Sequence, residues 1–220
     1  EIVDNSIDEA LAGYCETITV RVGSGSVVTV EDDGRGIPVD IHPTEKVSAL
    51  EVVMTKLNAG GKFDKHTYKV SGGLHGVGGS VVNALSEWME VSVHQDGKIH
   101  TQRYARGVPE APVRVTGETD RHGTTVRFKP DRQIFEDIEF SFDLLSNRLR
   151  ELAFLNKGLQ IAIADDRANP PKSHLFQFAG GVQSFIEYLN KNKELIHAEP
   201  VYFDSEREHV RVEVSLQYND

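Results

Sequence analysis

Glycine is concentrated in one stretch of this sequence. Residues 59–79 contain seven glycines of the 19 in the chain: Gly60, Gly61, Gly72, Gly73, Gly76, Gly78 and Gly79. So dense a run does not suit the interior of a helix or a strand, because glycine loses more conformational freedom on folding than any other residue. The stretch therefore predicts a mobile loop whose backbone can approach another group closely.

Helical and strand patterns alternate on both sides of this loop. Apolar residues at helical spacing occur in residues 46–58, 142–155 and 182–192. A further helix follows the loop, with Val77, Val81, Leu85 and Trp88 on its apolar face. Alternating residues predict a hairpin over 17–31, and more strands at about 89–94, 98–104, 124–129, 159–164 and 173–178.

The first residues predict a helix with an apolar and a polar stripe. Ile7, Leu11 and Tyr14 would form the apolar stripe. Glu1 and Asn5 lie four residues apart on a neighbouring polar stripe, which also includes Asp8 and Glu9. A carboxylate can take a proton from water, and an amide oxygen can ligate a hard cation such as Mg²⁺. The same spacing is also typical of an ordinary hydrated helix face, so the pair alone does not define a site.

Composition excludes several classes of protein. The net charge is −10, with 24 Lys and Arg against 34 Asp and Glu, which argues against a segment that grips DNA by itself. The single cysteine, Cys15, excludes a disulfide framework. No run approaches the roughly 20 apolar residues of a membrane helix. We therefore expect a cytoplasmic protein with no membrane partner.

Gly180 and Gly181 mark the predicted domain boundary. Residues 1–180 would form one domain and residues 181–220 the beginning of a second. The chain stops inside a strand pattern at its last residues, and a strand without a partner is unstable alone. The sequence is therefore expected to be a fragment of a longer protein.

Two further motifs suit a nucleotide. Asp32 follows a strand and precedes a glycine-rich turn, and a carboxylate accepts hydrogen bonds from a group such as the exocyclic amine of adenine. The run 71–79 leads into a helix, so its backbone N–H groups could bind anionic phosphates, although a flexible hinge would look similar. Lys62 could add a cation. Neither a P-loop nor a Rossmann glycine motif occurs, and the nine histidines show no metal-ligand spacing.

The order of these motifs resembles the nucleotide-binding domain of the GHKL ATPases, also called the Bergerat fold. Residues 2–10, 57–63, 69–78, 80–86 and 149–156 are similar to the ATPase subunits of bacterial type IIA DNA topoisomerases, of the gyrase type first and the topoisomerase IV type second. The resemblance covers the whole chain. It implies an α+β fold, a two-layer α/β sandwich with a mostly antiparallel sheet and helices on one face, followed by the start of a transducer domain of the ribosomal S5 domain 2 type.

The resemblance also implies roles for single residues. Glu1 matches the general base that activates water, Asn5 the Mg²⁺ ligand, and Asp32 the acceptor of the adenine amine. The implied ATP-binding residues are Asn5, Asp32, Lys62, Tyr68, Gly73, Leu74, His75, Gly76, Val77, Gly78, Gly79 and Thr124. The implied inhibitor rim is Arg35, Gly36, Ile37 and Pro38.

The implied function is ATP hydrolysis with Mg²⁺, which closes a dimer clamp for strand passage and negative supercoiling of DNA. The implied partners are a second copy of the chain, the gyrase A subunit through regions absent here, and DNA through the full enzyme. The alternatives are a topoisomerase IV subunit acting in decatenation, a signalling kinase without a visible phospho-accepting histidine, and a non-catalytic nucleotide-binding scaffold.

Three departures from the family pattern accompany the resemblance. The arm that reaches over the partner's nucleotide would precede Glu1, and a lysine that completes the γ-phosphate contacts would follow Asp220. Gln95 stands where gyrases commonly have an arginine that binds aminocoumarins, so weaker binding of that drug class is expected.

Overall fold

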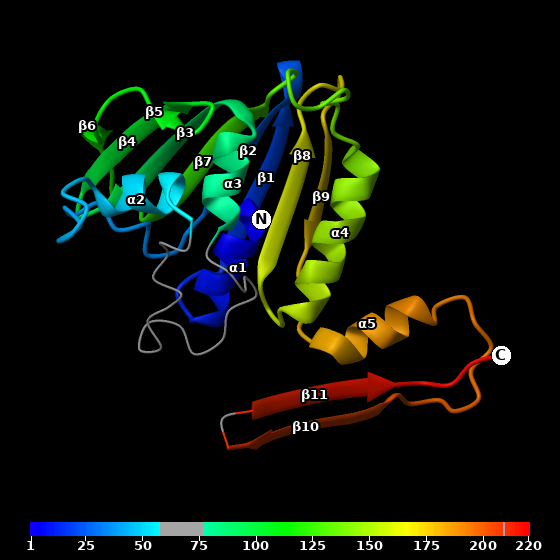
Figure 1. Ribbon diagram of the computed structural model, residues 1–220. Coiled ribbons are helices and arrows are strands. Elements are labelled where there is room, and N and C mark those ends of the chain that lie inside the picture. Colours follow the sequence, from blue (N-terminus) through cyan, green and yellow to red (C-terminus); the bar gives the residue numbers. More distant parts are fainter. Residues whose placement is uncertain (58–76, 209) are drawn as a thin grey trace.

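The computed structural model describes residues 1–57, 77–208 and 210–220, and its main feature is a nine-stranded sheet (Figure 1). The strand order is β5-β4-β3-β7-β2-β1-β8-β9, and β6 pairs with β4. The strands are β1 (Thr17–Gly23), β2 (Val27–Asp32), β3 (Ser86–Gln95), β4 (Lys98–Ala105), β5 (Val108–Pro109), β6 (Arg114–Glu118), β7 (Gly123–Pro130), β8 (Gln160–Asp165) and β9 (Lys172–Phe176).

The sheet is mostly antiparallel, as predicted. Strands β1 and β8 pair in parallel, with Thr17 opposite Gln160, whereas the neighbouring pairs β1–β2, β2–β7 and β3–β7 are antiparallel. A short 3₁₀ turn, η1 (Ser24–Ser26), joins β1 to β2. The predicted hairpin and the strands between residues 86 and 130 are confirmed. Strands β5 and β6 were not predicted, because two and five residues carry too little alternation.

Helices cover one face of this sheet (Figure 1). They are α1 (Ile2–Leu11), α2 (Ala49–Thr55), α3 (Gly78–Ala84) and α4 (Phe142–Leu155). One buried cluster joins the layers, with Ile18 and Ile161 from the sheet packed together with Leu50, Leu149 and Ala153 from the helices. The predicted two-layer α+β arrangement is confirmed.

Two predicted helix faces were wrong. Leu11 and Tyr14 are 46 % and 51 % exposed, because α1 ends at Leu11 and the chain turns at Gly13, whose φ is +85°. In α3, Val81 of the predicted face is exposed while Ser80 and Asn83 are buried. The helix also ends at Ala84, so Trp88 lies in β3 and not on this helix. Both helices therefore turn polar groups inward, which apolar periodicity does not reveal.

The last forty residues form a helix and a separate hairpin. Helix α5 (Gly181–Leu189) packs against α4, where the rings of Phe154 and Phe185 stack with centroids 5.0 Å apart. Among the described residues, strands β10 (Val201–Arg207) and β11 (Val210–Leu216) pair only with each other. The domain boundary at residue 180 stays a prediction. Within the described residues, no helix has the length and apolar character needed to cross a membrane.

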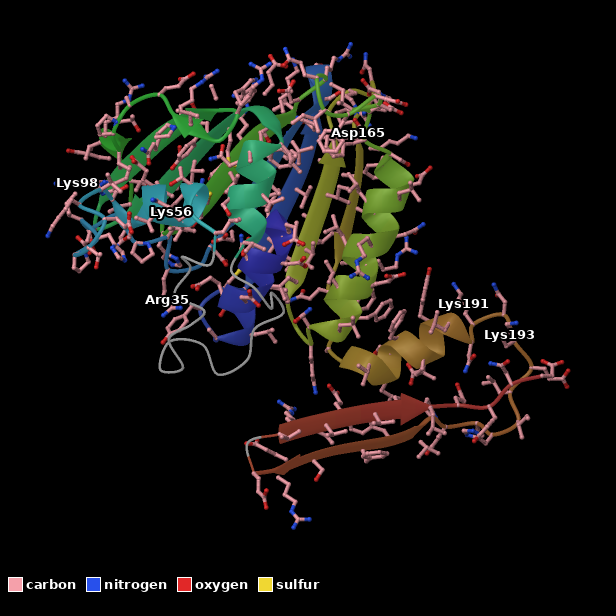
Figure 2. The ribbon with its side chains drawn as sticks, in the orientation of Figure 1. Arg35, Lys56, Lys98, Asp165, Lys191 and Lys193 are labelled. Carbon is pink, nitrogen blue, oxygen red and sulfur yellow. The ribbon has the colours of Figure 1, made fainter. Side chains whose placement is uncertain are left out.

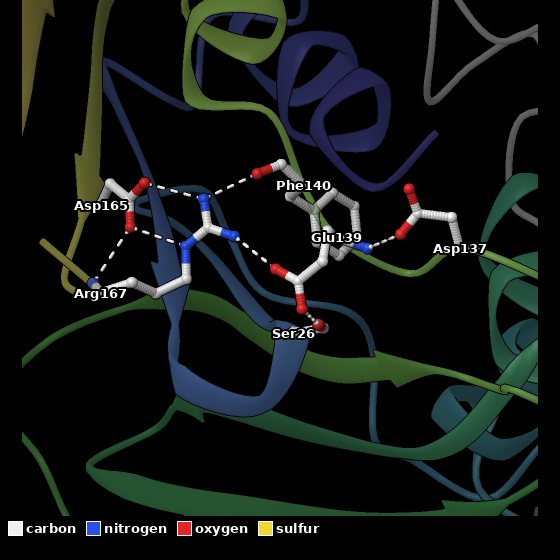
Figure 3. Close-up of polar contacts among 6 residues, drawn as sticks. All are labelled: Ser26, Asp137, Glu139, Phe140, Asp165 and Arg167. Atoms are coloured by element: carbon white, nitrogen blue, oxygen red, sulfur yellow. Dashed lines mark hydrogen bonds and ion pairs between the residues drawn. The ribbon is translucent and has the colours of Figure 1, made fainter.

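A network of hydrogen bonds and ion pairs connects the loops at one end of the sheet (Figure 3). Arg167 donates to both carboxylate oxygens of Asp165 at 2.9 and 2.8 Å, to Glu139 at 3.0 Å and to the Phe140 carbonyl at 2.6 Å. Ser26 in turn donates to Glu139 at 3.0 Å. The guanidinium holds the pKa of the Asp165 carboxyl below its usual range. We call these five residues the Arg167 network; it connects three loops that are distant in the sequence.

Candidate functional site

Helix α1 connects the residues predicted to act on a nucleotide. Glu1 is its N-cap residue, the following turn holds Asn5 and Ser6, and Glu9 lies one turn further on. Positions three and four residues apart fall on one side of a helix, and eight residues advance the helix by about 12 Å. The helix thus presents polar groups along a line comparable in length with an extended nucleoside triphosphate.

Asp32 lies at the end of β2, where three donors hold its carboxylate. The Ser6 hydroxyl donates to Oδ2 at 2.8 Å, and the backbone N–H groups of Gly34 and Thr124 donate to Oδ1 at 3.0 and 3.2 Å. Thr124 is itself buried, and its hydroxyl accepts from the N–H of Ile37 at 3.3 Å. Predicted residues of the adenine pocket, Asp32 and Thr124, are therefore brought into direct contact, together with one residue of the predicted rim.

The electrostatics of Asp32 distinguish it from its neighbour Asp33. Burial raises the pKa of Asp32 despite the hydrogen bonds from Ser6, Gly34 and Thr124, which act in the opposite direction. For Asp33, the hydrogen bonds that it accepts from the N–H groups of Glu16 and Thr17, at 2.8 and 3.0 Å, outweigh burial and lower the pKa. Asp33 thus anchors the loop to β1, while Asp32 is a half-buried acceptor whose charged form is disfavoured by burial.

A second group of predicted residues meets where α3 begins. The position a Cβ would take on Gly78 lies 2.3 Å from Oε2 of Glu1, so the bare backbone of Gly78 lies against the Glu1 carboxylate. The equivalent position on Gly79 is 3.8 Å from the side-chain nitrogen of Asn5. Glu1 caps α1 by position only, with no side-chain cap hydrogen bond. Glu1, Asn5, Gly78 and Gly79 therefore form one cluster at the opposite end of the α1 line from the rim.

Arg35 closes the other end of the site. Its guanidinium donates to both carboxylate oxygens of Glu9, at 3.0 and 2.9 Å, and lies 3.9 Å from the centroid of the Tyr14 ring. The side chain projects beside α1, far from Asp165 at the other end of the strands (Figure 2). Bidentate pairing and stacking fix an arginine more firmly than a single contact does. The predicted rim residues Gly36 and Pro38 follow Arg35 on the same loop.

A close backbone contact holds this loop against the sheet. Gly123 has a φ of +120°, and a Cβ added there would lie 2.0 Å from the carbonyl oxygen of Asp32. No side chain fits such an approach, so glycine is required. The ring of His122 adds a 2.9 Å hydrogen bond with the carbonyl oxygen of Gly34. The first residues of β7 therefore fix the geometry around Asp32.

Several predicted residues lie outside the described part of the chain. These are Lys62, Tyr68, Gly73, Leu74, His75 and Gly76. Val77 is described and precedes α3 directly. Among the described residues no group of three or more His, Cys, Asp and Glu side chains could hold a metal ion.

A cavity of about 410 Å³ lies between the sheet and the helices, beside Glu1. Its other walls include Val20, Val30, Phe128 and Leu149. These walls are largely apolar and do not include Asp32, so the cavity does not suit a charged triphosphate.

Sequence reasoning missed three residues of the site. Ser6 is buried beside Asp32, and its only sequence signal was its place next to Asn5 on the polar side of α1. Glu9 was placed on that stripe but not paired with Arg35, 26 residues away. Tyr14 was assigned to an apolar face, whereas it stacks under Arg35.

This combination of fold and site defines a class of ATPase. The family model described as histidine kinase-, DNA gyrase B- and HSP90-like ATPase matches residues 1–134. The chain belongs to this ATPase family.

Within the family, the similarity is to DNA gyrase B. The chain is 57 % identical to the DNA gyrase B protein of Thermotoga maritima and 55 % identical to that of Treponema pallidum, in each case over 100 % of this chain and 35 % of the relative. It therefore spans about a third of the length of these relatives. The resemblance predicted from the sequence is confirmed, and these comparisons favour the gyrase type over the topoisomerase IV type.

A solved structure shows the same fold. The 43K ATPase domain of Thermus thermophilus gyrase B, in complex with an aminocoumarin, matches with a TM-score of 0.85 at 40 % identity. The match covers 99 % of this chain and 55 % of that one.

Proposed function

We propose that this chain is the ATP-hydrolysing part of a gyrase B-type subunit in a bacterial type IIA DNA topoisomerase. The observation that carries the proposal is the line of groups along α1, where Ser6 contacts Asp32 at one point and Glu1 contacts Gly78 a turn earlier. A nucleotide whose base binds Asp32 would extend its phosphates toward Glu1. A single helix would thereby position the residues at both ends of the bound nucleotide.

Asp32 is proposed to accept a hydrogen bond from the exocyclic amine of adenine. Three protein donors already orient its carboxylate, and burial makes a further donor favourable because a charged acceptor in a low-dielectric site gains more from each bond. Thr124 would lie at the base of the pocket. Arg35, held by Glu9 and Tyr14, would form the rim with Gly36, Ile37 and Pro38.

Backbone groups are proposed to hold the phosphates. The glycines at 73, 76, 78 and 79, together with Leu74, His75 and Val77, would present N–H groups, which suit phosphate oxygens. Lys62 and Tyr68 would add side-chain contacts. Support within the described residues is the close approach of Gly78 and Gly79 to Glu1 and Asn5.

Glu1 is proposed as the general base. Its carboxylate would take a proton from a water molecule while the water oxygen forms a bond to the γ-phosphorus. The bond from that phosphorus to the bridging β-phosphate oxygen breaks, and ADP leaves with its electron pair. Such phosphoryl transfer depends mainly on positioning and on charge stabilisation, which the fixed α1 and α3 backbones supply.

Asn5 is proposed as the protein ligand of Mg²⁺. Its amide oxygen is a hard donor, and it lies beside a carboxylate and the backbone expected to meet the phosphates. Mg²⁺ usually takes few protein ligands and completes its shell with phosphate oxygens and water, so a single amide fits. When bound, the ion would neutralise charge that develops on the phosphate oxygens.

The activity of the whole protein is part of the same proposal. ATP binding would dock two copies of the chain, hydrolysis would release them, and the cycle would drive strand passage and negative supercoiling. Residues 181–220 would begin the transducer domain. The gyrase A subunit and DNA would engage through the rest of the enzyme, in the cytoplasm, and an aminocoumarin would compete at the rim.

Two variants of the full subunit test the proposal. Glu1→Gln should reduce ATP turnover to a small residual rate, while a slowly cleaved ATP analogue with Mg²⁺ still raises the melting temperature. Asp32→Asn should remove that rise. Glu118→Gln, an exposed carboxylate on β6, is the control and should change neither. ATP turnover at the wild-type rate in Glu1→Gln would refute the role of Glu1 as the general base.

A DNA assay tests the type of topoisomerase. The complete enzyme should supercoil relaxed plasmid in an ATP-dependent manner. Decatenation without supercoiling would assign it to the topoisomerase IV type instead.

A further inference from the structure

The last turn of α3 carries a buried amide that the ATPase assignment does not use. Asn83 is 0 % exposed, and its Nδ2 donates to the carbonyl oxygen of Met54 at 2.8 Å. Its Oδ1 is buried and, among the described residues, has no hydrogen-bond partner. Leaving such an acceptor unpaired costs free energy, so the residue is not explained by stability alone.

The hydrogen bond joins two helices at a defined point. Met54 lies in the last turn of α2, where backbone carbonyl groups have no partner within the helix. Asn83 supplies that partner from α3. An apolar side chain of similar size could pack in the same place, but it would leave the Met54 carbonyl without this donor.

Asn83 shares its face of α3 with the glycine that meets α2. Gly79 lies four residues earlier, and a Cβ built on it would be 3.4 Å from the sulfur of Met54. The same position is 3.8 Å from the Asn5 side chain, and the neighbouring Gly78 lies against the Glu1 carboxylate. The start of α3 is therefore wedged between α2 and α1, and a shift of α3 along α2 would move the backbone that contacts Glu1.

We propose that Asn83 is a positioning residue for ATP hydrolysis: its hydrogen bond to Met54 fixes α3 on α2 and so sets the Gly78 backbone against the Glu1 carboxylate. The inference rests on the proposed function, since Glu1 is the proposed base. Asn83 touches neither Glu1 nor Asp32 in the contacts described above. It acts through the position of α3.

The test uses the full subunit in its complete enzyme. Asn83→Leu keeps the approximate volume and removes the donor, and Asn83→Asp serves as a second variant if the first does not fold. We expect kcat per folded molecule to fall at least tenfold, while KM for ATP changes less than threefold because Asp32 and its donors are intact. Amide hydrogen exchange of α3 in the unliganded protein should accelerate at least tenfold.

Ser86→Ala is the matched control. The Ser86 hydroxyl is also buried, and it donates at 2.6 Å to the carbonyl oxygen of Val82, the residue before Asn83, without reaching α2. Its loss should leave kcat and exchange at the start of α3 within threefold of wild type.

A double-variant cycle with Glu1→Gln shows whether Asn83 acts through the base. In the Glu1→Gln background, the Asn83 substitution should lower the residual turnover less than threefold, because the base it positions is already absent. Full additivity of the two losses would overturn the inference.

The possible results distinguish failure of the positioning role of Asn83 from failure of the proposed ATPase function. Loss of turnover in Glu1→Gln, with normal kcat in the Asn83 variants, overturns the inference and leaves the ATPase assignment standing. Normal turnover in Glu1→Gln removes the assigned base, and the positioning role fails with it. Unchanged α3 exchange in the Asn83 variants overturns the helix-fixing step by itself.

Discussion

Replacing Asp32 by asparagine should affect nucleotide binding and folding very differently. The amide keeps the shape of the carboxylate, and its oxygen can still accept from the N–H groups of Gly34 and Thr124. Its nitrogen can donate to the Ser6 hydroxyl, which now accepts instead of donating. The native contacts survive in number, while the buried charge disappears.

The magnitudes follow from these contacts. Loss of a hydrogen bond from the adenine amine to a charged acceptor costs about 1.5–3 kcal/mol, which weakens ATP binding about 10- to 100-fold. For folding, the weaker hydrogen bonds of a neutral acceptor oppose the relief of burying a charge. We expect the free energy of unfolding at pH 7 to change by no more than about 1 kcal/mol.

The pH dependence gives a second, independent signature. Because the pKa of Asp32 is raised, the native state binds more protons at this group than the unfolded state between the ordinary and the raised pKa. Its contribution to the free energy of unfolding therefore falls as pH rises through that window. Asp32→Asn should abolish this slope, so the variant gains stability relative to wild type as pH increases.

Calorimetric titration with a slowly cleaved ATP analogue and urea unfolding from pH 4 to 8 measure both effects. The reasoning is refuted if the variant binds the analogue within threefold of wild type. A loss of more than about 3 kcal/mol in unfolding free energy would also contradict it, because the carboxylate would then be a structural group.

Three further substitutions address the fold and the rim. Arg167→Ala should lower the free energy of unfolding, measured in urea, by about 2 kcal/mol, because it leaves buried acceptors of the Arg167 network unpaired. Arg148→Ala, the control, breaks an exposed ion pair and should lower the free energy of unfolding by under about 0.5 kcal/mol. Gly123→Ala should cost more than about 3 kcal/mol and weaken ATP binding, whereas Gly97→Ala, at a φ of +75° with open space around it, should cost about 1–2 kcal/mol. Gln95→Arg should tighten aminocoumarin binding in a direct binding assay, since it adds a guanidinium beside the proposed rim.

Each of these measurements has a contrary result. Equal destabilisation by Arg167→Ala and Arg148→Ala would show that the network adds nothing beyond a surface ion pair. Equal effects of Gly123→Ala and Gly97→Ala would mean that backbone strain, and not contact with Asp32, requires Gly123. Unaltered aminocoumarin affinity in Gln95→Arg would show that position 95 does not contribute to aminocoumarin binding.

The local sequence pattern was sufficient to predict a helix or strand where that element buries one apolar face. The alternation over residues 17–31 predicted β1 and β2, and the helical spacing over 142–155 predicted α4 with the bounds observed. The motifs also identified Glu1, Asn5 and Asp32 as candidate site residues, because the chemistry of a carboxylate or amide beside glycines can be recognised from residue types. For these features the information lies within a few neighbouring residues.

The tertiary structure decided which faces turn inward and which residues meet. The parallel pairing of β1 with β8 joins segments about 140 residues apart, and no local pattern encodes it. The contacts of Ser6 with Asp32 and of Asn83 with Met54 likewise join different elements. Periodicity identifies a helix by its apolar residues, whereas α1 and α3 bury Ser6 and Asn83, whose side chains donate hydrogen bonds to groups on other elements.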